Sequence, residues 1–347
     1  MNIGVVGAGN ISGIYLKNLS GMFADKITLK AIADGFPEKA KEAAEKYRID
    51  FEPSVESLLA RKDIDIVLNI TNPASHYPVA RAALEAGKHV YNEKPLCTTL
   101  EDGKALMKLA NEKGLRVGSA TDTFLGAGVQ TAKKLLQEGA IGKPVAAVFF
   151  MMNHGPESWH PNPDFYYDIG GGPVLDMAPY YLNTLFELLG KVTSVKSEAS
   201  KSFDTRTAKD GHSISVKTPT HIQSVLDFND GTNAVKATAI FSFDIWTHSL
   251  PHIEIYGSEG SLQIGDPNWF TSPVKICKKE DIKDGSASWH DVVLTAPAYA
   301  KPEWLTNDNW RGIGLTDMAL SIEQDKPHRA SGDRGLHALD VMTKMLN

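Results

Sequence analysis

The sequence predicts an α/β protein with two domains, a doubly wound parallel sheet and then an α+β domain with a large, mostly antiparallel open sheet. In the first third, short apolar runs alternate with segments of helical periodicity, which is typical of a parallel sheet crossed by helices. Beyond residue 190, polar and apolar residues alternate instead, and hairpin-like turns separate the runs. The 347 residues suffice for two cores, and we place the domains at 1–122 and 123–347.

The elements of the first domain follow one another through short turns. Strands are predicted at 2–7, 27–34, 65–70, 89–93 and 115–120, and helices at 10–20, 37–47, 55–63, 76–88 and 100–114. The run 65-DIVLNI-70 is almost continuously apolar, as expected for a central strand that helices cover on both faces. Strand–helix alternation of this kind implies a doubly wound parallel sheet.

The second domain begins with a helix at 126–138 and a long strand at 143–155. A helix rich in leucine then starts at Pro173, which suits the first helical position. Alternating strands are predicted at 192–200, 221–228, 232–243, 252–257 and 261–265. The end of the chain reads as two helices, and we expect the last, about 333–346, to pack back on the first domain.

Composition excludes several classes of protein. The net charge is −6 and there is no basic run, which argues against a nucleic-acid-binding surface. No stretch of about 18 uncharged apolar residues occurs, so no membrane partner is expected. The start, MNIGVVGAGN, lacks the pattern of a secretory signal, and we expect a cytoplasmic protein. Cys97 and Cys277 have no metal-binding spacing, so reduced thiols and no metal site are expected.

The first turn, 7-GAGNIS-12, follows a strand and opens a helix. Gly7 would permit a tight turn, and Gly9 would let a pyrophosphate approach the backbone. The helix start at Asn10 and Ile11 would supply free N–H groups and a favourable dipole. This is a G-x-G-x-x-S variant of the dinucleotide fingerprint, and its context at the end of the first strand favours that function over a purely structural turn.

Asp34 ends the second predicted strand. A carboxylate there can accept hydrogen bonds from the adenine-ribose hydroxyls and would repel a 2′-phosphate. No arginine follows it, although Lys39 and Lys41 lie nearby, so NAD is favoured over NADP as the cofactor. The alternative is that Asp34 caps the helix that begins near Pro37.

Two further motifs complete a recognisable series. The glycine turn, Asp34, 71-TNPASH-76 and 93-EKP-95 stand in this order along the chain. Together they resemble the Gfo/Idh/MocA family, the relatives of glucose–fructose oxidoreductase and inositol dehydrogenase, over nearly the whole chain. The resemblance implies a nicotinamide-binding Rossmann domain, a second domain with a large open sheet, and hydride transfer at a sugar or cyclitol hydroxyl.

The resemblance also implies roles for residues of these motifs. Thr71, Asn72 and His76 resemble the loop that passes along the cofactor, although His76 could instead be a polar residue at a helix start. Glu93 resembles a cofactor contact near the nicotinamide ribose. Lys94 resembles the catalytic lysine, also beside the cofactor, and the peptide before Pro95 is expected to be cis.

Candidate substrate residues lie in the second domain. Trp159 and His160 belong to a proline-rich loop, 156–172, whose aromatic and polar groups suit a sugar, unless the loop packs on its own domain. Asp176 and Tyr180 are four apart, so they share one face of the following helix. The family usually has histidine at the position of Tyr180, although some branches have tyrosine. The alternative for Tyr180 is a buried tyrosine that satisfies a backbone group.

These residues suggest a mechanism for an NAD(P)-dependent oxidoreductase acting on a secondary hydroxyl of a sugar, anhydrosugar or cyclitol. Oxidation of a carbinol needs a proton acceptor, and Lys94 fits that role, with Tyr180 as donor or relay and Asp176 as orienting group. Two alternatives remain open: an NAD-dependent glycosidase that cleaves by oxidation and elimination, and a non-catalytic sugar sensor. The open sheet offers a face that another subunit could cover, and the family implies homodimers or homotetramers.

Overall fold

The structure, a computed structural model, describes all residues, 1–347, and divides into two compact units. The first unit comprises Met1–Asp122 and Trp310–Leu339, and the second unit comprises Thr123–Asn309 and Asp340–Asn347. No helix is long and apolar enough to cross a bilayer.

The first unit contains a six-stranded parallel sheet with the order β3-β2-β1-β4-β5-β6. Its strands are β1 (Asn2–Val6), β2 (Thr28–Ala33), β3 (Asp50–Phe51), β4 (Ile66–Asn69), β5 (His89–Asn92) and β6 (Val117–Ser119). Its helices are α1 (Ser12–Ser20), α2 (Pro37–Tyr47), α3 (Val55–Ala60), α4 (Pro73–Glu85), α5 (Leu100–Lys113) and α8 (Ile313–Glu323), with the first part of α9 (Gly332–Leu346). This is the predicted doubly wound sheet, and its strand order reverses direction between β1 and β4.

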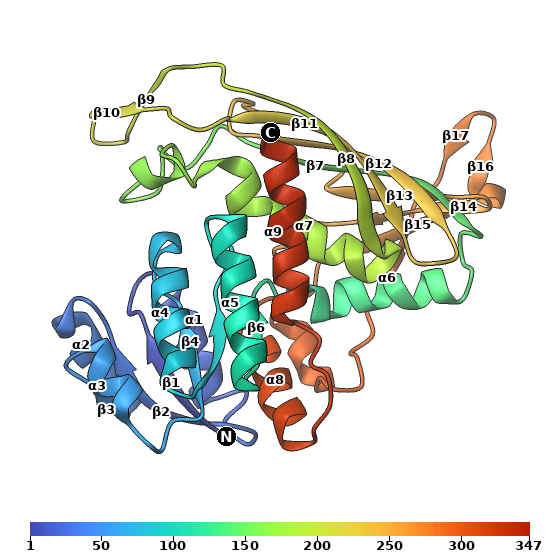
Figure 1. The fold of residues 1–347 in the computed structure, drawn as a ribbon. Helices are drawn as coiled ribbons and strands as arrows, with labels where there is room; N and C mark the ends of the chain where they lie inside the picture. Colours follow the sequence, from blue (N-terminus) through green and yellow to red (C-terminus); the bar gives the residue numbers. More distant parts are fainter. The chain divides into compact units, whose positions relative to one another are not determined.

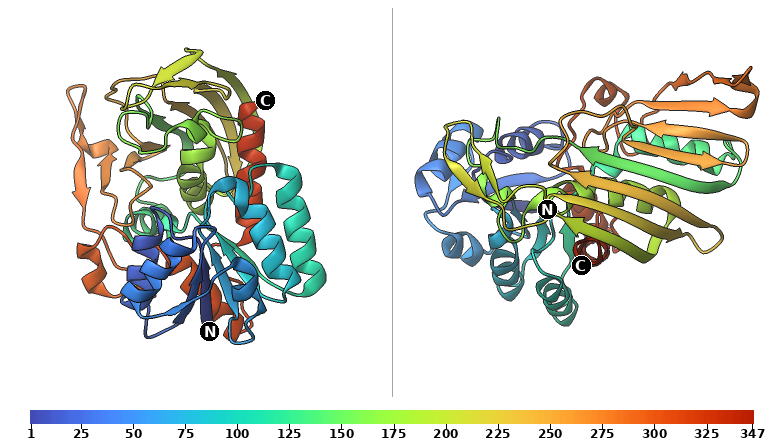
Figure 2. Two further views of the ribbon diagram at one scale, coloured as in Figure 1. Left: turned by 90° about the vertical axis from the view of Figure 1, so that its left-hand side faces the viewer. Right: turned by 90° about the horizontal axis from the view of Figure 1, so that it is seen from above.

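Burial explains the pattern of the central strands. All four residues of β4 are buried, and so are four of the five residues of β1. Helices cover both faces of this sheet (Figures 1 and 2), so apolar side chains are required on both sides of each central strand. The carboxyl ends of β1, β4 and β5 therefore present the residues that follow them along one edge of the sheet.

Helix α9 belongs partly to each unit. In the first unit, Leu336 and Leu339 lie against Gly103 of α5, and Gly335 lies so close to Ser119 of β6 that an added Cβ would come within 2.6 Å of it. In the second unit, the main-chain oxygen of Met345 accepts a 2.7 Å hydrogen bond from Ser197 Oγ.

The second unit contains an eight-stranded sheet with the order β18-β15-β14-β13-β7-β12-β11-β8. Its strands are β7 (Pro144–Met152), β8 (Lys191–Ser200), β11 (His221–Asn229), β12 (Ala234–Ser242), β13 (Ile253–Gly257), β14 (Gly260–Ile264), β15 (Val274–Lys278) and β18 (His290–Val292). Strands β7 and β12 pair in parallel and the other neighbours are antiparallel, so the predicted mostly antiparallel sheet is confirmed.

Two helices and two small ribbons complete this unit. Helices α6 (Ala127–Gln137) and α7 (Gly172–Leu189) pack on one face of the sheet, and no helix covers the opposite face (Figures 1 and 2). The ribbons are β9 (Thr205–Thr207) with β10 (Ser213–Ser215), and β16 (Ile282–Lys283) with β17 (Ser286–Ala287). The ribbon strands, β15 and β18 were not predicted. Each ribbon strand has only two or three residues, too few to establish a period.

Candidate functional site

The turn after β1 requires glycine at its first position. Gly7 has φ +116°, and a Cβ there would lie 2.7 Å from the main-chain carbon and oxygen of Ile70, which follows β4. A side chain at Gly7 would therefore collide with the neighbouring chain. Gly9, in contrast, faces open space, with nothing within 4 Å of an added Cβ. The backbone at Gly9 is thus accessible to a ligand, as the fingerprint requires.

The start of α1 has no side chain that caps it. The N-cap position, Ile11, makes no side-chain cap bond, and no acidic residue lies in the first turn. The hydroxyl of Ser12 donates to the main-chain oxygen of Gly9 at 2.7 Å, so it does not occupy the helix N–H groups. Asn10 is exposed. This helix end suits an anionic group, because its N–H groups and dipole favour negative charge.

Asp34 follows β2, beside the glycine turn. One carboxylate oxygen accepts a 2.6 Å bond from the N–H of Ala8, and the other accepts a 2.7 Å bond from the N–H of Phe36. Helix α2 has Phe36 as its N-cap, without a side-chain cap bond, so the alternative that Asp34 caps α2 does not describe this structure. Phe36 is 69% exposed, and the Lys39 ammonium lies 5.1 Å from the centre of its ring.

Two buried amides join the loops that follow β4 and β5. Asn69 Nδ2 donates to Asn92 Oδ1 and to the main-chain oxygen of His76, each at 3.0 Å. Asn69 Oδ1 accepts a 2.7 Å bond from the Thr71 hydroxyl, and Asn92 Nδ2 donates to the main-chain oxygen of Leu96 at 3.0 Å. These side chains end neighbouring strands, since Asn69 pairs with Asn92 in the sheet register.

The TNPASH segment starts α4 three residues earlier than predicted. Asn72 is the N-cap and accepts a 3.2 Å bond from the N–H of Ser75, while Pro73 occupies the first turn. His76 is buried within the helix, and its ring nitrogens lie 2.7 Å from the main-chain oxygen of Pro95 and 3.1 Å from that of Thr71. Burial lowers the pKa of His76. The imidazole therefore connects the two loops, and its cofactor contact stays a prediction.

The EKP segment follows β5. The peptide between Lys94 and Pro95 is cis, as the resemblance implied. Glu93 is only 7% exposed, and its two oxygens accept hydrogen bonds from Tyr15 Oη at 2.7 Å and from the N–H of Lys94 at 2.8 Å. Lys94 itself is half-buried. The cofactor contact of Glu93 and the catalytic role of Lys94 stay predictions.

A second buried carboxylate, Asp122, lies near Glu93. Its Oδ2 accepts bonds from the N–H groups of Gly314 at 2.9 Å and Gly312 at 3.2 Å, at the start of α8. Burial raises the pKa of Asp122 to about 6, and the nearby charge of Glu93 adds to this. The two N–H groups and the charge of Arg311 lower the pKa of Asp122 and offset part of this rise. The buried hydroxyl of Tyr91 has no hydrogen-bond partner.

In the second unit, Asp176 and Tyr180 lie one turn apart on α7. Asp176 is half-buried and Tyr180 is 6% exposed. Pro179 lies inside this helix, and Asn183 Nδ2 donates to its main-chain oxygen at 2.9 Å. Tyr180 is thus buried, as its alternative interpretation requires, while its participation in catalysis is still a prediction.

The proline-rich loop is partly anchored and partly exposed. Trp159 is 66% exposed, and its ring lies edge-on to that of His160, with centroids 5.4 Å apart. His160 also contacts the rings of Phe165 and Tyr166. The N–H of Asn162 donates to His160 Nδ1 at 3.0 Å, so His160 Nε2 can carry the proton and donate outward.

A buried ion network holds the base of this loop. Arg206, from β9, donates to Glu157 Oε1 at 3.1 Å and to Asp244 Oδ1 at 2.5 Å. The side chains of all three are 5% exposed. The Tyr167 hydroxyl donates to the other oxygen of Glu157, and the ring of Tyr167 lies 5.7 Å from the Arg206 guanidinium. The start of the loop is thus tied to Arg206 of β9, and Tyr167 is bonded to the same carboxylate of Glu157, whereas Trp159 is left exposed.

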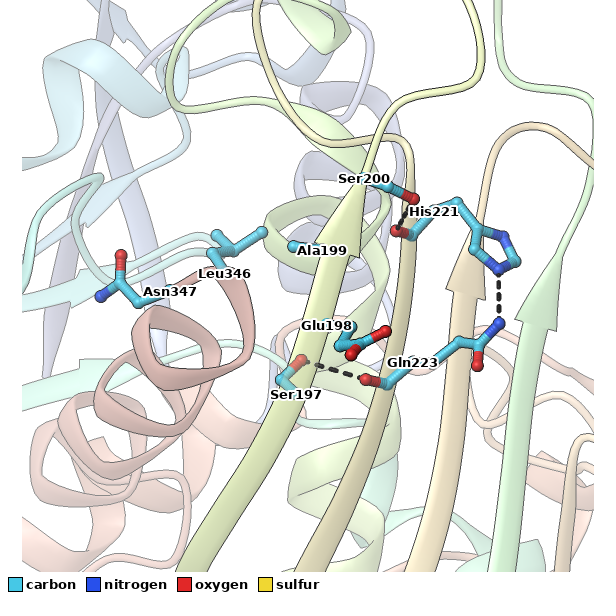
Figure 3. A pocket seen from close by; sticks show the side chains of 8 residues that line it. All are labelled: Ser197, Glu198, Ala199, Ser200, His221, Gln223, Leu346 and Asn347. Atoms are coloured by element: carbon cyan, nitrogen blue, oxygen red, sulfur yellow. Dashed lines mark hydrogen bonds between the residues drawn. The ribbon is translucent and has the colours of Figure 1, made fainter.

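A pocket of about 410 Å³ lies elsewhere in the second unit, beside β8, β11 and the end of α9. Figure 3 shows that its side chains come from Ser197 to Ser200, His221, Gln223, Leu346 and Asn347. None of the predicted site residues lines it.

Models of one protein family match most of the chain. A model described as "Oxidoreductase family, NAD-binding Rossmann fold" matches residues 1–121, and "GFO/IDH/MocA C-terminal domain" matches residues 129–263. The chain belongs to the Gfo/Idh/MocA family of oxidoreductases. Its first unit is accordingly the NAD-binding Rossmann domain of this family.

Two curated relatives illustrate the similarity within the Gfo/Idh/MocA family. The chain is 30% identical to 1,5-anhydro-D-fructose reductase of Ensifer adhaerens over 60% of its own length and 59% of the reductase. It is 29% identical to levoglucosan dehydrogenase of Pseudarthrobacter phenanthrenivorans over 85% of its own length and 79% of that enzyme. For three of the curated relatives, including this reductase, the chain matches only about half of the relative's own length, from 48% to 59%.

A solved structure has the same fold. An NAD-binding oxidoreductase from Klebsiella pneumoniae superposes with a TM-score of 0.84 and 20% sequence identity, covering 99% of this chain and 96% of that chain. At this identity the likeness supports the fold alone.

The sequence prediction omitted several buried polar residues that lie beside the predicted site residues. Asn69 and Asn92 are polar residues at the ends of apolar strands, and Asp122 follows β6 by three residues. These positions are a signal that could have been used. Tyr15 and Arg206 gave no such signal, because their partners lie 78 residues and 38 or more residues away in the sequence.

Proposed function

We propose that this protein is an NAD-dependent dehydrogenase that oxidises a secondary hydroxyl of a sugar, anhydrosugar or cyclitol. The observation that carries the proposal is the arrangement at one edge of the Rossmann sheet. The open glycine turn follows β1, and the half-buried Lys94 follows β5, with only β4 between these two strands. Ligands of open α/β sheets bind at such an edge, where the strand order reverses. The sugar-related activities of the two named relatives support the substrate class.

The first unit has features that fit a dinucleotide. Gly9 and the uncapped start of α1 suit the pyrophosphate, and the Asp34 carboxylate suits ribose hydroxyls. Each oxygen of Asp34 accepts one main-chain N–H and retains a lone pair for a hydroxyl donor. Phe36 offers an exposed aromatic face for the adenine. A 2′-phosphate would meet the charge of Asp34, which favours NAD over NADP. When bound, the nicotinamide supplies the hydride acceptor.

Lys94 is proposed to accept the proton of the reacting hydroxyl. An alcohol does not release its proton unaided at neutral pH, so a positioned base must accept it. The Lys94 amine, in its neutral form, would accept the proton during oxidation and return it during reduction of a ketone. Asp176 would orient the amine or bind a neighbouring hydroxyl, and Tyr180 would donate to the reacting oxygen. Thr71, Asn72 and His76 would line the cofactor.

The exposed side of the proline-rich loop is proposed to bind the sugar. The indole of Trp159 offers an apolar face for ring C–H groups, and His160 Nε2 can donate to a hydroxyl. Apolar faces and hydroxyl rims alternate on a sugar, so an aromatic residue beside a polar one suits it.

A substrate panel tests the proposal directly. Purified protein is incubated with anhydrosugars first, then with simple sugars and inositols, each with NAD and with NADP, and NADH or NADPH formation is followed by absorbance. We expect turnover with at least one compound and a preference for NAD. Sugar-bond cleavage without net NADH would favour the redox-elimination glycosidase. Sugar binding by calorimetry without any turnover would favour a sensor.

We also infer that the helix-free face of the eight-stranded sheet mediates self-association. Across this face Val148, Thr238 and Val225 form one register row, and the last two are exposed. Exposed apolar and small residues on an open sheet suit a second copy. Light scattering after gel filtration is expected to show a dimer or tetramer, and Val225→Lys is expected to dissociate it. A monomeric parent protein would contradict this inference.

A further inference from the structure

We propose that Tyr15 is a positioning residue for Lys94, acting through the buried carboxylate of Glu93. Tyr15 lies on α1, the helix that starts at the glycine turn, and its ring and hydroxyl are fully buried. Its Oη donates to Glu93 Oε1 at 2.7 Å, and Glu93 Oε2 accepts the main-chain N–H of Lys94 at 2.8 Å. One carboxylate thus connects the cofactor-side helix with the backbone of the proposed catalytic lysine.

The backbone on both sides of Lys94 is also fixed by contacts with the loops and strands around it. The N–H of Glu93 donates to the main-chain oxygen of Asn69 at 2.9 Å. On the other side, the main-chain oxygen of Pro95 lies 2.7 Å from His76 Nδ1, and that of Leu96 accepts Asn92 Nδ2 at 3.0 Å. Among the main-chain hydrogen bonds around Lys94, that of its own N–H is accepted by the side chain of Glu93. The orientation of Glu93 is therefore a requirement for a fixed Lys94 backbone.

Tyr15 is suited to hold Glu93 in place. Burial and the adjacent carboxylate raise the pKa of Tyr15 well above its usual value, so its hydroxyl remains a donor over the whole working range of pH. A neutral donor orients the carboxylate without cancelling its charge. A lysine or arginine in the same place would cancel it. Without the hydroxyl, a buried carboxylate would lack one of its two protein donors and would turn to find another. That movement would release the Lys94 N–H.

The first test is amide hydrogen exchange, which needs neither substrate nor activity. The peptide must begin several residues before Glu93, so that the amide of Lys94 keeps its label. Pro95 has no N–H, so within 93–97 such a peptide reports on Glu93, Lys94, Leu96 and Cys97. In Tyr15→Phe we expect exchange of this peptide to be about tenfold faster, with exchange in α2 unchanged. Tyr47→Phe is the matched control, because its hydroxyl also donates to α1, at Gly13, but does not reach Glu93. Equal protection of 93–97 in Tyr15→Phe and parent would overturn the proposal.

The second test is kinetic and rests on the proposed function. Tyr15→Phe is expected to lower kcat about 10- to 100-fold, because small displacements of a catalytic group are costly, with NADH affinity changed less than about threefold. Glu93→Gln should have a similar effect, and the double variant should be no worse than the poorer single one. Tyr47→Phe should match the parent.

The two tests separate the two ideas. A parent that turns over no sugar but shows faster exchange at 93–97 in Tyr15→Phe would remove the proposed function and keep the positioning role. Parental kcat in Tyr15→Phe, or independent multiplicative losses in the double variant, would remove Tyr15 from the positioning of Lys94. Faster exchange throughout the first unit would show a general loss of stability and would also contradict the proposal.

Discussion

The two units bury carboxylates in different ways. In the first unit, Glu93 and Asp122 accept hydrogen bonds from a tyrosine hydroxyl and from main-chain N–H groups. In the second unit, Glu157 and Asp244 are both bonded to the guanidinium of Arg206. Neutral donors orient a carboxylate but leave its charge in place, whereas an arginine largely cancels it.

This difference matches the two tasks that we propose. Beside the proposed cofactor edge, the charge of Glu93, which is bonded to neutral donors, can act on the chemistry. At the base of the proline-rich loop, a cancelled charge serves to fix the loop while Trp159 remains exposed. On this proposal, the buried carboxylates of the first unit act through their charge, and those of the second unit hold the proline-rich loop in place.

The largest expected effect concerns Lys94 in the first unit. Lys94→Ala is expected to lower turnover roughly 10²–10⁴-fold while cofactor affinity changes little, because it removes only the proton acceptor. Lys94→Arg keeps the positive charge but cannot give up its proton, so it should be as inactive as the alanine variant. Steady-state kinetics and NADH titration measure both. Turnover close to that of the parent in Lys94→Ala would exclude Lys94 from the chemistry.

The next largest effect concerns Arg206 in the second unit. Arg206→Met leaves Glu157 and Asp244 buried beside an apolar side chain, which is expected to lower the free energy of unfolding by about 3–5 kcal/mol. Urea unfolding followed by tryptophan fluorescence measures this loss. Arg81→Met, which breaks the exposed pair with Glu85, should change nothing measurable. Unaltered stability of Arg206→Met would mean that the network does not anchor the loop.

A smaller effect should depend on pH. Because the folded-state pKa of Asp122 is about 6, against about 3.9 for an unfolded aspartate, its protonated form stabilises the fold below about pH 4, and this contribution is lost as the pH rises through 6. Asp122→Asn cannot titrate, yet its oxygen can still accept the two N–H bonds. Relative to the parent, this variant should therefore gain stability, on the order of 3 kcal/mol, between about pH 4 and pH 7.

Urea unfolding at a series of pH values measures that difference. Asp230→Asn is a suitable control, because hydrogen bonds from Asn233 and Thr232 lower the pKa of Asp230 to about 2. Its difference from the parent should stay constant over the same range. A constant difference for Asp122→Asn as well would show that Asp122 is ionised at both ends of the range.

The smallest effect concerns the exposed aromatic side of the second unit. Trp159→Ala is expected to raise the KM for the sugar about five- to tenfold with little change in kcat, because it removes a ground-state contact. Trp269→Ala removes another partly exposed indole of the same unit and serves as the control. If both variants keep the parental KM, the substrate role of the proline-rich loop is wrong.

Local patterns in the sequence predicted most elements of the fold. The central strands, the glycine turn and α7 lie where periodicity, glycine and Pro173 indicated. The start of α4 was missed by three residues because the capping effect of Asn72 was not used. Strands β9 and β10 were missed because three residues do not establish a period. The parallel pairing of β7 with β12 joins segments about 90 residues apart, and alternation alone does not specify a partner.

The sequence by itself determined the elements, the order of the motifs and the chemistry available at each, because these depend on neighbours within a few residues. Only the tertiary structure decided which distant residues bond to these side chains and fix their positions. Tyr15 meets Glu93 across 78 residues, and Asp122 meets Gly312 across 190. Such pairings follow from the packing of the whole unit, in which a buried carboxylate must find whichever donor the surrounding elements bring to it.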